Sequence, residues 1–288
     1  MAEDQQRVEV VTPQQILETP DLIAVGVAGD DVRRRMHGTR TTFVRVLEMH
    51  VDAPLSALPQ GAQPGEIRII GAPSSLDSAV AAVRAAVAVS NGVVVTGFSV
   101  EDLTSLGPLG ATIRSLKEAG LAAIAQLPLD LLDDAIAMAG QVSGGGLTIN
   151  TMTVHAASDE AGLALCERAR DLQAAAGGFK AFAPLPRTTS VTRPTTGYDD
   201  VKTVSLARVV VSNVPSIQVD WQLYGPKMAQ VALTVGADDV DNVSAIDPGI
   251  LGTRRSPIEE IKGNITAAAL EAIERDGLFR HLSPRRHQ

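Results

Sequence analysis

The sequence predicts a single (β/α)8 barrel of the TIM type. Short stretches rich in β-branched residues alternate with stretches in which apolar residues recur at helical spacing, which is typical of parallel strands joined by helices. Eight strand candidates can be counted in the 288 residues, 45% of which are hydrophobic. A barrel of this kind commonly uses about 250 residues as one unit. We therefore expect one barrel with a helical lead-in over residues 1–279, and a basic, frayed tail over residues 280–288.

The lead-in is expected to be helical. Within residues 12–35, Thr12 followed by Pro13 is typical of an N-cap with proline at the first helical position. The first strand candidate, residues 41–47, follows at once and is rich in β-branched residues. A loop rich in Pro, Gly and Gln, residues 54–65, closes it.

The other strand and helix candidates alternate to the end of the chain. Ser75 is typical of an N-cap, and Leu76, Val80 and Val83 recur on one face of the helix that follows it. The later strand candidates are 66–70, 92–98, 121–126, 147–154, 179–185, 217–221 and 237–240. The helix candidates between and after them begin near Ser75, Ser99, Leu131, Ser158, Thr196, Gly225 and Ser256.

Composition excludes several classes of partner and location. The net charge is −8, so we expect no general attraction to nucleic acid or to anionic membranes. No apolar run approaches the roughly 20 residues that span a bilayer. The polar amino terminus lacks a signal-peptide core, and a single cysteine excludes an internal disulfide. These features predict a cytoplasmic protein.

The carboxyl-side half carries the motifs of a known family. The run DDVKTVSLARVVVSNVPSIQVDWQLYGPKMAQVALTVGADDVD, residues 199–241, resembles a helix ending in N-x-P, a strand with tryptophan, G-x-x-x-A-Q-x-A-L and G-A-D-D-x-D. Residues 170–173, 177–185 and 274–276 resemble R-x-L-Q, G-G-F-x-x-F-x-P-L and E-R-D/N. This pattern resembles the aminofutalosine synthase branch of the radical S-adenosylmethionine (SAM) superfamily, which works in the futalosine route to menaquinone. The resemblance covers most of the chain and implies a barrel with its reactive face at the carboxyl ends of the strands.

The departures from the family pattern concern its cofactors. In the radical SAM group, three cysteines of a CxxxCxxC loop after the first barrel strand hold a 4Fe-4S cluster, and the remaining iron binds SAM. Residues 50–65 contain no cysteine, and Cys166 is the single cysteine of the chain. Residues 122–127 replace the glycine-rich turn that the family carries after its fourth strand. We therefore expect neither a 4Fe-4S cluster nor SAM.

His155 and Glu101 are the candidate catalytic residues. His155 stands at the predicted exit of the fifth strand, where barrel ligands bind, and imidazole acts as acid, base or hydrogen-bond donor near neutral pH. Glu101 lies just beyond the third strand. A purely structural histidine is the alternative for His155, and a favourable interaction with the helix dipole is the alternative for Glu101.

Four further residues are candidates for ligand binding. Arg187 follows the sixth strand and can pair with a ligand carboxylate through two parallel hydrogen bonds, the alternative being a solvated loop arginine. Gln126 and His50 stand at strand exits. Trp221 can stack on a flat ligand, although packing in the barrel wall is the alternative.

The aspartates between residues 238 and 241 have the oxygen ligands that hard cations prefer. Adjacent carboxylates without a fixed loop pattern are usually solvated or capping, so we expect no metal site here.

Two functions remain open, and with them the question of whether the chain is an enzyme. The first is a cluster-free, non-radical homologue, a pseudoenzyme that binds a small carboxylate-bearing aromatic or nucleoside ligand. Within this first function, the alternative to a small ligand is a partner protein linked to menaquinone biosynthesis, either an active paralogue or a second copy of the chain. The second is a non-radical lyase or hydrolase that uses the strand-exit residues. The first is favoured because no acid–base or nucleophile constellation stands out in the sequence.

Overall fold

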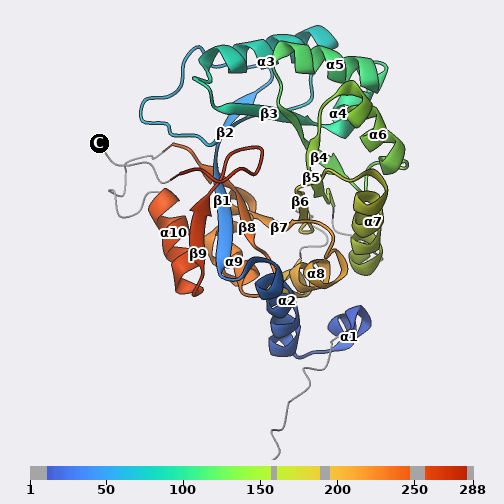
Figure 1. The fold of residues 1–288 in the computed structure, drawn as a ribbon, viewed down its shortest axis with the longest axis vertical. Helices are drawn as coiled ribbons and strands as arrows, with labels where there is room; N and C mark the ends of the chain where they lie inside the picture. The colour runs from blue at the N-terminus through green and yellow to red at the C-terminus, as the bar shows by residue number, and fades with distance from the viewer. Residues whose placement is uncertain (1–11, 157–160, 189–194, 247–256, 284–288) are drawn as a thin grey trace, which may run out of the picture.

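The computed structural model describes residues 12–156, 161–188, 195–246 and 257–283, and it contains the expected (β/α)8 barrel (Figure 1). Within these residues, eight parallel strands form a ring in the order β2-β3-β4-β5-β6-β7-β8-β1, and β1 pairs back with β2 to close it. The strands are β1 (Arg40–His50), β2 (Glu66–Ile70), β3 (Val94–Ser99), β4 (Ala123–Pro128), β5 (Ile149–Thr153), β6 (Ala181–Ala183), β7 (Ser216–Asp220) and β8 (Asp239–Ser244).

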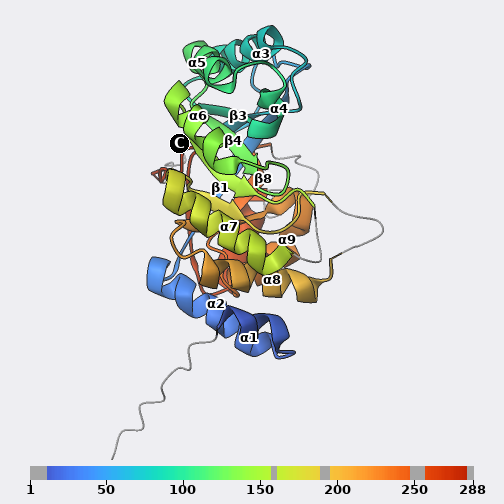
Figure 2. The same cartoon turned by 90° about the vertical axis from the view of Figure 1, so that its right-hand side faces the viewer.

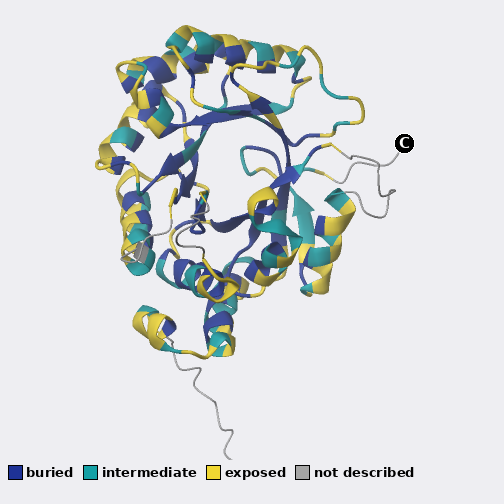
Figure 3. Cartoon of the chain, turned by 180° about the vertical axis from the view of Figure 1, so that it is seen from behind, coloured by how far each residue is buried: buried dark blue, intermediate teal, exposed yellow. Residues whose placement is uncertain are grey.

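Helices cover the outside of the ring, and their buried faces meet the strands, as the dark inner surface in Figure 3 shows. The lead-in helices α1 and α2 lie beside α8, beyond the barrel itself (Figure 2). The helices are α1 (Pro13–Glu18), α2 (Leu22–His37), α3 (Leu76–Val89), α4 (Val100–Thr104), α5 (Leu109–Ala119), α6 (Ala135–Gly145), α7 (Ala161–Ala176), α8 (Gly197–Val210), α9 (Trp221–Leu233) and α10 (Pro257–Ala267).

Some of the expected N-caps lie among the described residues, and others do not. The side chains of Thr12, Ser75 and Thr196 accept hydrogen bonds from the third residue of their helices, as the sequence predicted. Ser158 and Ser256 lie outside the described residues.

Strand β1 closes the barrel because it is long enough, at 11 residues, to pair with three strands. Its carboxyl half pairs with β2, its middle pairs with β8, and its amino half pairs with β9 (Glu271–Glu274). The sequence analysis did not predict β9, which has four residues and is only partly buried. So short a strand shows no clear alternation of apolar and polar residues.

The connection from β1 to β2 is a loop, residues 51–65, without a helix. This is the segment in which the resembled family carries its cluster cysteines. Every later crossover in the ring contains at least one helix within the described residues.

Strand β8 begins within the aspartate run, which the sequence analysis placed at the end of a shorter strand, residues 237–240. Asp238, Asp239 and Asp241 are 3%, 0% and 2% exposed. The expectation of solvated or capping carboxylates is therefore wrong. Burial is possible because each carboxylate forms an ion pair with a buried arginine: Asp239 and Asp241 pair inside the barrel, and Asp238 pairs with Arg208 of α8.

A β-bulge in β8 turns two consecutive side chains into the barrel. The pairing between β1 and β8 shifts register between Phe43 and Arg45, and Asn242 has a φ of 59°. An extra residue in a bulge interrupts the alternation of faces along a strand. Asp241 and Asn242 therefore both line the same cavity.

The chain after β9 crosses the interior of the ring. In this turn the Asp276 carboxylate accepts hydrogen bonds from the backbone of Leu278 and Arg280, and Asn150 of β5 donates to the carbonyl of Gly277 at 2.7 Å. The turn forms a floor across the barrel, visible inside the ring in Figure 3. The expected boundary after residue 279 falls within it, and residues 284–288 lie outside the described residues.

In the part of the chain that the structure describes, no helix combines the length and the apolar character that a membrane span needs.

Candidate functional site

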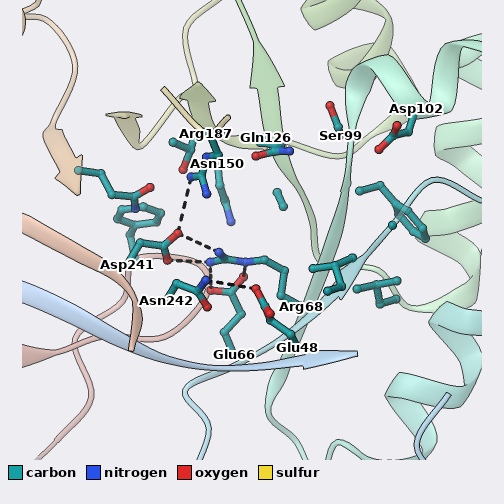
Figure 4. A pocket seen from close by; sticks show the side chains of 18 of the residues that line it. Glu48, Glu66, Arg68, Ser99, Asp102, Gln126, Asn150, Arg187, Asp241 and Asn242 are labelled. Atoms are coloured by element: carbon teal, nitrogen blue, oxygen red, sulfur yellow. Dashed lines mark hydrogen bonds and ion pairs between the residues drawn. The ribbon is translucent and has the colours of Figure 1, made fainter. Parts of the chain in front are cut away.

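A polar cavity of about 170 Å³ opens at the carboxyl ends of the strands, where barrel enzymes place their sites. We call it the mouth cavity. Its wall combines apolar groups of Ile69, Phe98 and Ala125 with charged groups that Figure 4 shows converging on the centre. The charged and polar residues that define it are Glu66, Arg68, Ser99, Arg187, Gln218 and Asp241.

Arg68 occupies the centre of this cavity. Its guanidinium donates two hydrogen bonds of 2.8 Å to Asp241 and two of 2.9 Å to Glu66 (Figure 4). Burial acts to lower the pKa of Arg68, but the two carboxylates outweigh it and raise the pKa well above its ordinary value. For Asp241, burial acts to raise the pKa, but Arg68 and two further arginines hold it well below its ordinary range. Arg68 and Asp241 are therefore ionised and paired with each other at neutral pH.

Arg187 borders the same cavity and bonds to Asp220 at 3.0 Å, with Asp241 at 3.9 Å. Burial raises the pKa of Asp220, and Arg187 opposes that shift in part. Asp220 also caps α9 through the backbone of Leu223. The Arg187 side chain is 23% exposed, against 14% for Arg68, so it is the more accessible of the two to a ligand.

Two buried atoms of the cavity lining have no partner among the described residues. The Ser99 hydroxyl and the Gln218 amide oxygen make no hydrogen bond, although these residues are only 5% and 2% exposed. The Gln218 nitrogen is used, because it donates to Asp239 at 2.8 Å. An unpaired buried polar atom lowers the free energy of unfolding by about 1–3 kcal/mol. A ligand that forms a hydrogen bond with either atom would recover part of that cost.

The backbone near Ser99 is strained. Phe98, which precedes it, has a φ of 63°, a left-handed conformation that a bulky residue rarely adopts. Phe98 and Asn242 both line the mouth cavity, and both have positive φ. Strained residues of this kind cluster at functional sites, because the surrounding structure must hold them in place.

A second, smaller hollow of about 140 Å³ adjoins the mouth cavity. It is lined by His155, Glu101 and Asp102, and it shares Gln126 and Arg187 with the larger cavity. The His155 ring nitrogen lies 3.1 Å from the Thr188 hydroxyl. Burial raises the pKa of Asp102 above its ordinary value.

The structure thus brings together four of the six predicted site residues: His155, Glu101, Gln126 and Arg187 line this hollow. His50 and Trp221 line neither cavity. The His50 ring instead covers Gly71, where a φ of +88° and an imidazole nitrogen 2.7 Å from the position of any Cβ require glycine. Trp221 is 8% exposed at the start of α9.

Sequence reasoning missed the residues at the centre of the mouth cavity. Glu66 and Arg68 alternate on one face of β2, and this spacing marks them as inward-facing once the strand is assigned. Ser99 resembled a helix cap, yet it makes no capping hydrogen bond. Gln218 lay in a stretch taken as an ordinary buried strand.

Comparison with known proteins agrees with the expected relationship. Residues 176–272 match the family model described as the CofH/MqnC C-terminal region. The chain is 31% identical over 207 residues to aminodeoxyfutalosine synthase of Thermus thermophilus, covering 61% of this chain and 55% of that protein. It is 27% identical over 225 residues to a 5-amino-6-(D-ribitylamino)uracil–L-tyrosine 4-hydroxyphenyl transferase of Methanosarcina acetivorans, covering 66% and 56%. The chain thus spans about half the length of these curated relatives.

Solved structures support the fold. Methylornithine synthase PylB superposes with a TM-score of 0.63 at 11% identity, over 92% of this chain and 95% of that one. The FeFe-hydrogenase maturase HydG from Carboxydothermus hydrogenoformans gives a TM-score of 0.64 at 11% identity, over 93% and 76%. At this identity the likeness concerns the barrel alone.

The expectation that neither a 4Fe-4S cluster nor SAM belongs to this protein is contradicted by these relationships. The relatives are radical SAM enzymes, which use both cofactors. The expectation rested on the missing motif alone.

The described residues nevertheless do not fit a cluster held by three thiolates of this chain. The single cysteine, Cys166, is 2% exposed on α7 and lines neither cavity. Burial, with a smaller contribution from Glu167, raises the pKa of its thiol to about 12. Such a thiol is a poor metal ligand, since the ligand is the thiolate.

Proposed function

Because this chain is related to radical SAM enzymes of the aminodeoxyfutalosine synthase kind, we propose that its mouth cavity binds a small nucleoside-like or aromatic molecule rich in hydrogen-bond donors. The observation that carries the proposal is the pair of unpartnered buried atoms, Ser99 Oγ and Gln218 Oε1, in a cavity at the carboxyl end of the barrel. An amide oxygen accepts only, so the ligand group that meets Gln218 is a donor such as a hydroxyl or an amino group.

The charges around the cavity support a donor-rich ligand. The central arginine is fully occupied by Asp241 and Glu66, while Glu48 and Asp102 add carboxylates at the rim. Glu48 accepts one hydrogen bond, from Asn242 at 3.2 Å (Figure 4). These acceptors favour hydroxyl and amino groups over a second anion near the centre.

A carboxylate on the ligand, as the sequence analysis expected, has one suitable place. Arg187 lies between the two hollows and has the accessible guanidinium of the site. The ligand carboxylate would compete with Asp220 for it. We propose that Arg187 orients such a group while the inner end of the ligand meets Ser99 and Gln218.

The second candidate is catalysis without radicals, as a lyase or hydrolase. The observation in its favour is that His155, Glu101 and Asp102 line one hollow next to the ligand cavity. A carboxyl group with a raised pKa beside an imidazole is a usual acid–base arrangement. Binding of a partner protein linked to menaquinone biosynthesis, either a paralogue or a second copy, remains a prediction from the resemblance.

Calorimetric titration of the full chain with adenosine and with aminodeoxyfutalosine, the compound for which a relative is named, tests the proposal. We expect saturable binding that weakens roughly tenfold in Arg187→Gln for the carboxylate-bearing ligand only. Arg170→Gln, which breaks an exposed ion pair with Asp171, is the matched control and should change nothing. Absence of binding to both compounds by the wild-type chain would contradict the proposal.

Product analysis of the same mixtures separates the two candidates. Binding without turnover supports a ligand-binding role. A product that forms with the wild-type chain and disappears in His155→Ala supports the enzyme.

A further inference from the structure

A second cavity, of about 470 Å³, opens at the amino ends of the strands, on the side opposite the mouth. We call it the base cavity. Arg40 and Thr42 line it from the start of β1, Lys180 from the residue before β6, and Ser216 from the start of β7. Arg275 and Phe279 line both cavities, so the turn after β9 is the partition between them.

The lining of the base cavity is basic, although the whole chain has a net charge of −8. Among the described residues, Asp238 is the one acidic residue of the lining. It is already neutralised, because it forms an ion pair with Arg208 and lies 3.4 Å from His37. The cationic lining residues are Arg40, Lys180, Arg275 and Arg280, and His37 and His281 also line the cavity.

Two of these cations have no carboxylate partner in the described part of the chain. Arg275 pairs with Asp239, and Arg280 pairs with Asp276 at 2.7 Å. By contrast, the Arg40 guanidinium donates a single weak hydrogen bond, to the His37 carbonyl at 3.4 Å, and the Lys180 ammonium donates none to the described residues.

Ser216 adds a buried donor between these cations. It is 7% exposed, and its hydroxyl makes no hydrogen bond to the described residues. Ser216 and Gln218 lie on the same face of β7, because alternate residues of a strand face the same side. Since Gln218 lines the mouth cavity, Ser216 also faces the barrel interior.

We propose that the base cavity binds a small anion that carries phosphate groups. Two unpaired cations and a buried hydroxyl, with His281 at the rim, offer the donors that phosphate oxygens accept. The volume lies within the range of about 300–1,000 Å³ that is typical of small-molecule sites. A concave site of this kind favours a phosphate-bearing small molecule over an acidic protein segment. Because barrel chemistry takes place at the other end, this site serves holding or regulation rather than catalysis.

The proposal is independent of the ligand at the mouth, and its test uses a different probe. Isothermal titration of the full chain with inorganic pyrophosphate should show one saturable site. We expect Lys180→Met and Arg40→Gln each to weaken it roughly tenfold or more, because each removes one charge-assisted contact. Arg84→Gln, an exposed arginine on α3, removes the same charge elsewhere and should leave the affinity unchanged.

Each other outcome overturns the site. Equal weakening in all three variants would show general screening by net charge, and absence of saturation at millimolar pyrophosphate would show that no site exists. If poly-glutamate binds with the same dependence on Lys180 and Arg40 while pyrophosphate does not, the surface serves a protein partner instead. Because Lys180 and Arg40 are exposed, unchanged circular dichroism of both variants is expected and confirms that they fold. Ser216→Ala provides a further variant that changes no charge, and it should weaken pyrophosphate binding as well.

Discussion

The two ends of the barrel differ in how they use arginine. At the mouth, Arg68 is fully paired with Glu66 and Asp241, and the unsatisfied atoms are neutral. At the base, Arg40 and Lys180 are without carboxylate partners among the described residues, and the buried carboxylate there is neutralised by other groups. The number of charged residues near a cavity therefore does not identify its ligand. The ligand is indicated by the charged groups that have no ion-pair partner.

This difference arises from where the charged residues lie along their strands. At the mouth, Asp241 and Arg68 lie on the inward faces of β8 and β2 and meet within the ring. At the base, Arg40 begins β1 and Lys180 precedes β6, and both side chains are exposed. Exposed cations remain solvated at little cost, whereas buried ones need partners.

The largest effect is expected at the paired centre of the mouth. Arg68→Met leaves Asp241 and Glu66 buried without their main partner, and we expect it to lower the free energy of unfolding by about 3–5 kcal/mol. Urea denaturation measures this. Arg170→Met, at the exposed pair with Asp171, should leave the urea midpoint in place. A loss at Arg68 as small as that control would show that the network contributes nothing.

Phe279→Ala tests the partition between the two cavities. The ring packs on the Arg275 guanidinium at 3.7 Å and is half-buried, so we expect a loss of about 2 kcal/mol, below the usual cost of a fully buried phenylalanine. In the wild type, adenosine and pyrophosphate should bind independently, and in Phe279→Ala they should compete. Leu278→Ala, which borders only the base cavity, should preserve independence. Competition already present in the wild type would mean that the two cavities are one site.

Ser99→Ala sharpens the description of the mouth. The hydroxyl is buried and has no partner among the described residues, so its removal should raise the free energy of unfolding by up to about 1–3 kcal/mol. Binding of a nucleoside-like ligand should weaken by about 0.5–1.5 kcal/mol, the net value of one hydrogen bond. Calorimetry on Ser99→Ala and on Ser115→Ala, an exposed helical serine on α5, gives the comparison. Unaltered affinity in Ser99→Ala would remove this atom from the site.

The smallest effect on stability is expected at the base. Lys180→Met should change the free energy of unfolding by no more than about 0.5 kcal/mol, because an exposed lysine without an ion-pair partner contributes little. Thermal denaturation without added anion provides the measurement. A marked loss would show that Lys180 supports the fold, and the same variant could not then be used to report on anion binding alone.

The sequence predicted at which end of the barrel the candidate site lies, but not which side chains point into it. The sequence analysis placed four residues at one end of the barrel, because the carboxyl ends of parallel strands lie together. These residues are His155, Glu101, Gln126 and Arg187. His50 is also a strand end, yet its side chain turns over Gly71 rather than into the cavity. A strand exit determines the end of the barrel at which a residue lies, not the direction of its side chain.

The sequence by itself determined the barrel and the relationship, since hydrophobic periodicity and the motifs in residues 199–241 are local patterns. The tertiary structure alone decided which charges are paired. Arg68 and Asp241 are 173 residues apart, and they meet because β1 closes the ring between β2 and β8, which puts the inward faces of β2 and β8 on one cavity. No local pattern records a contact across that separation. Which charged side chains remain unpaired and available to a ligand is decided only in the closed barrel, because ion pairing depends on which strands become neighbours.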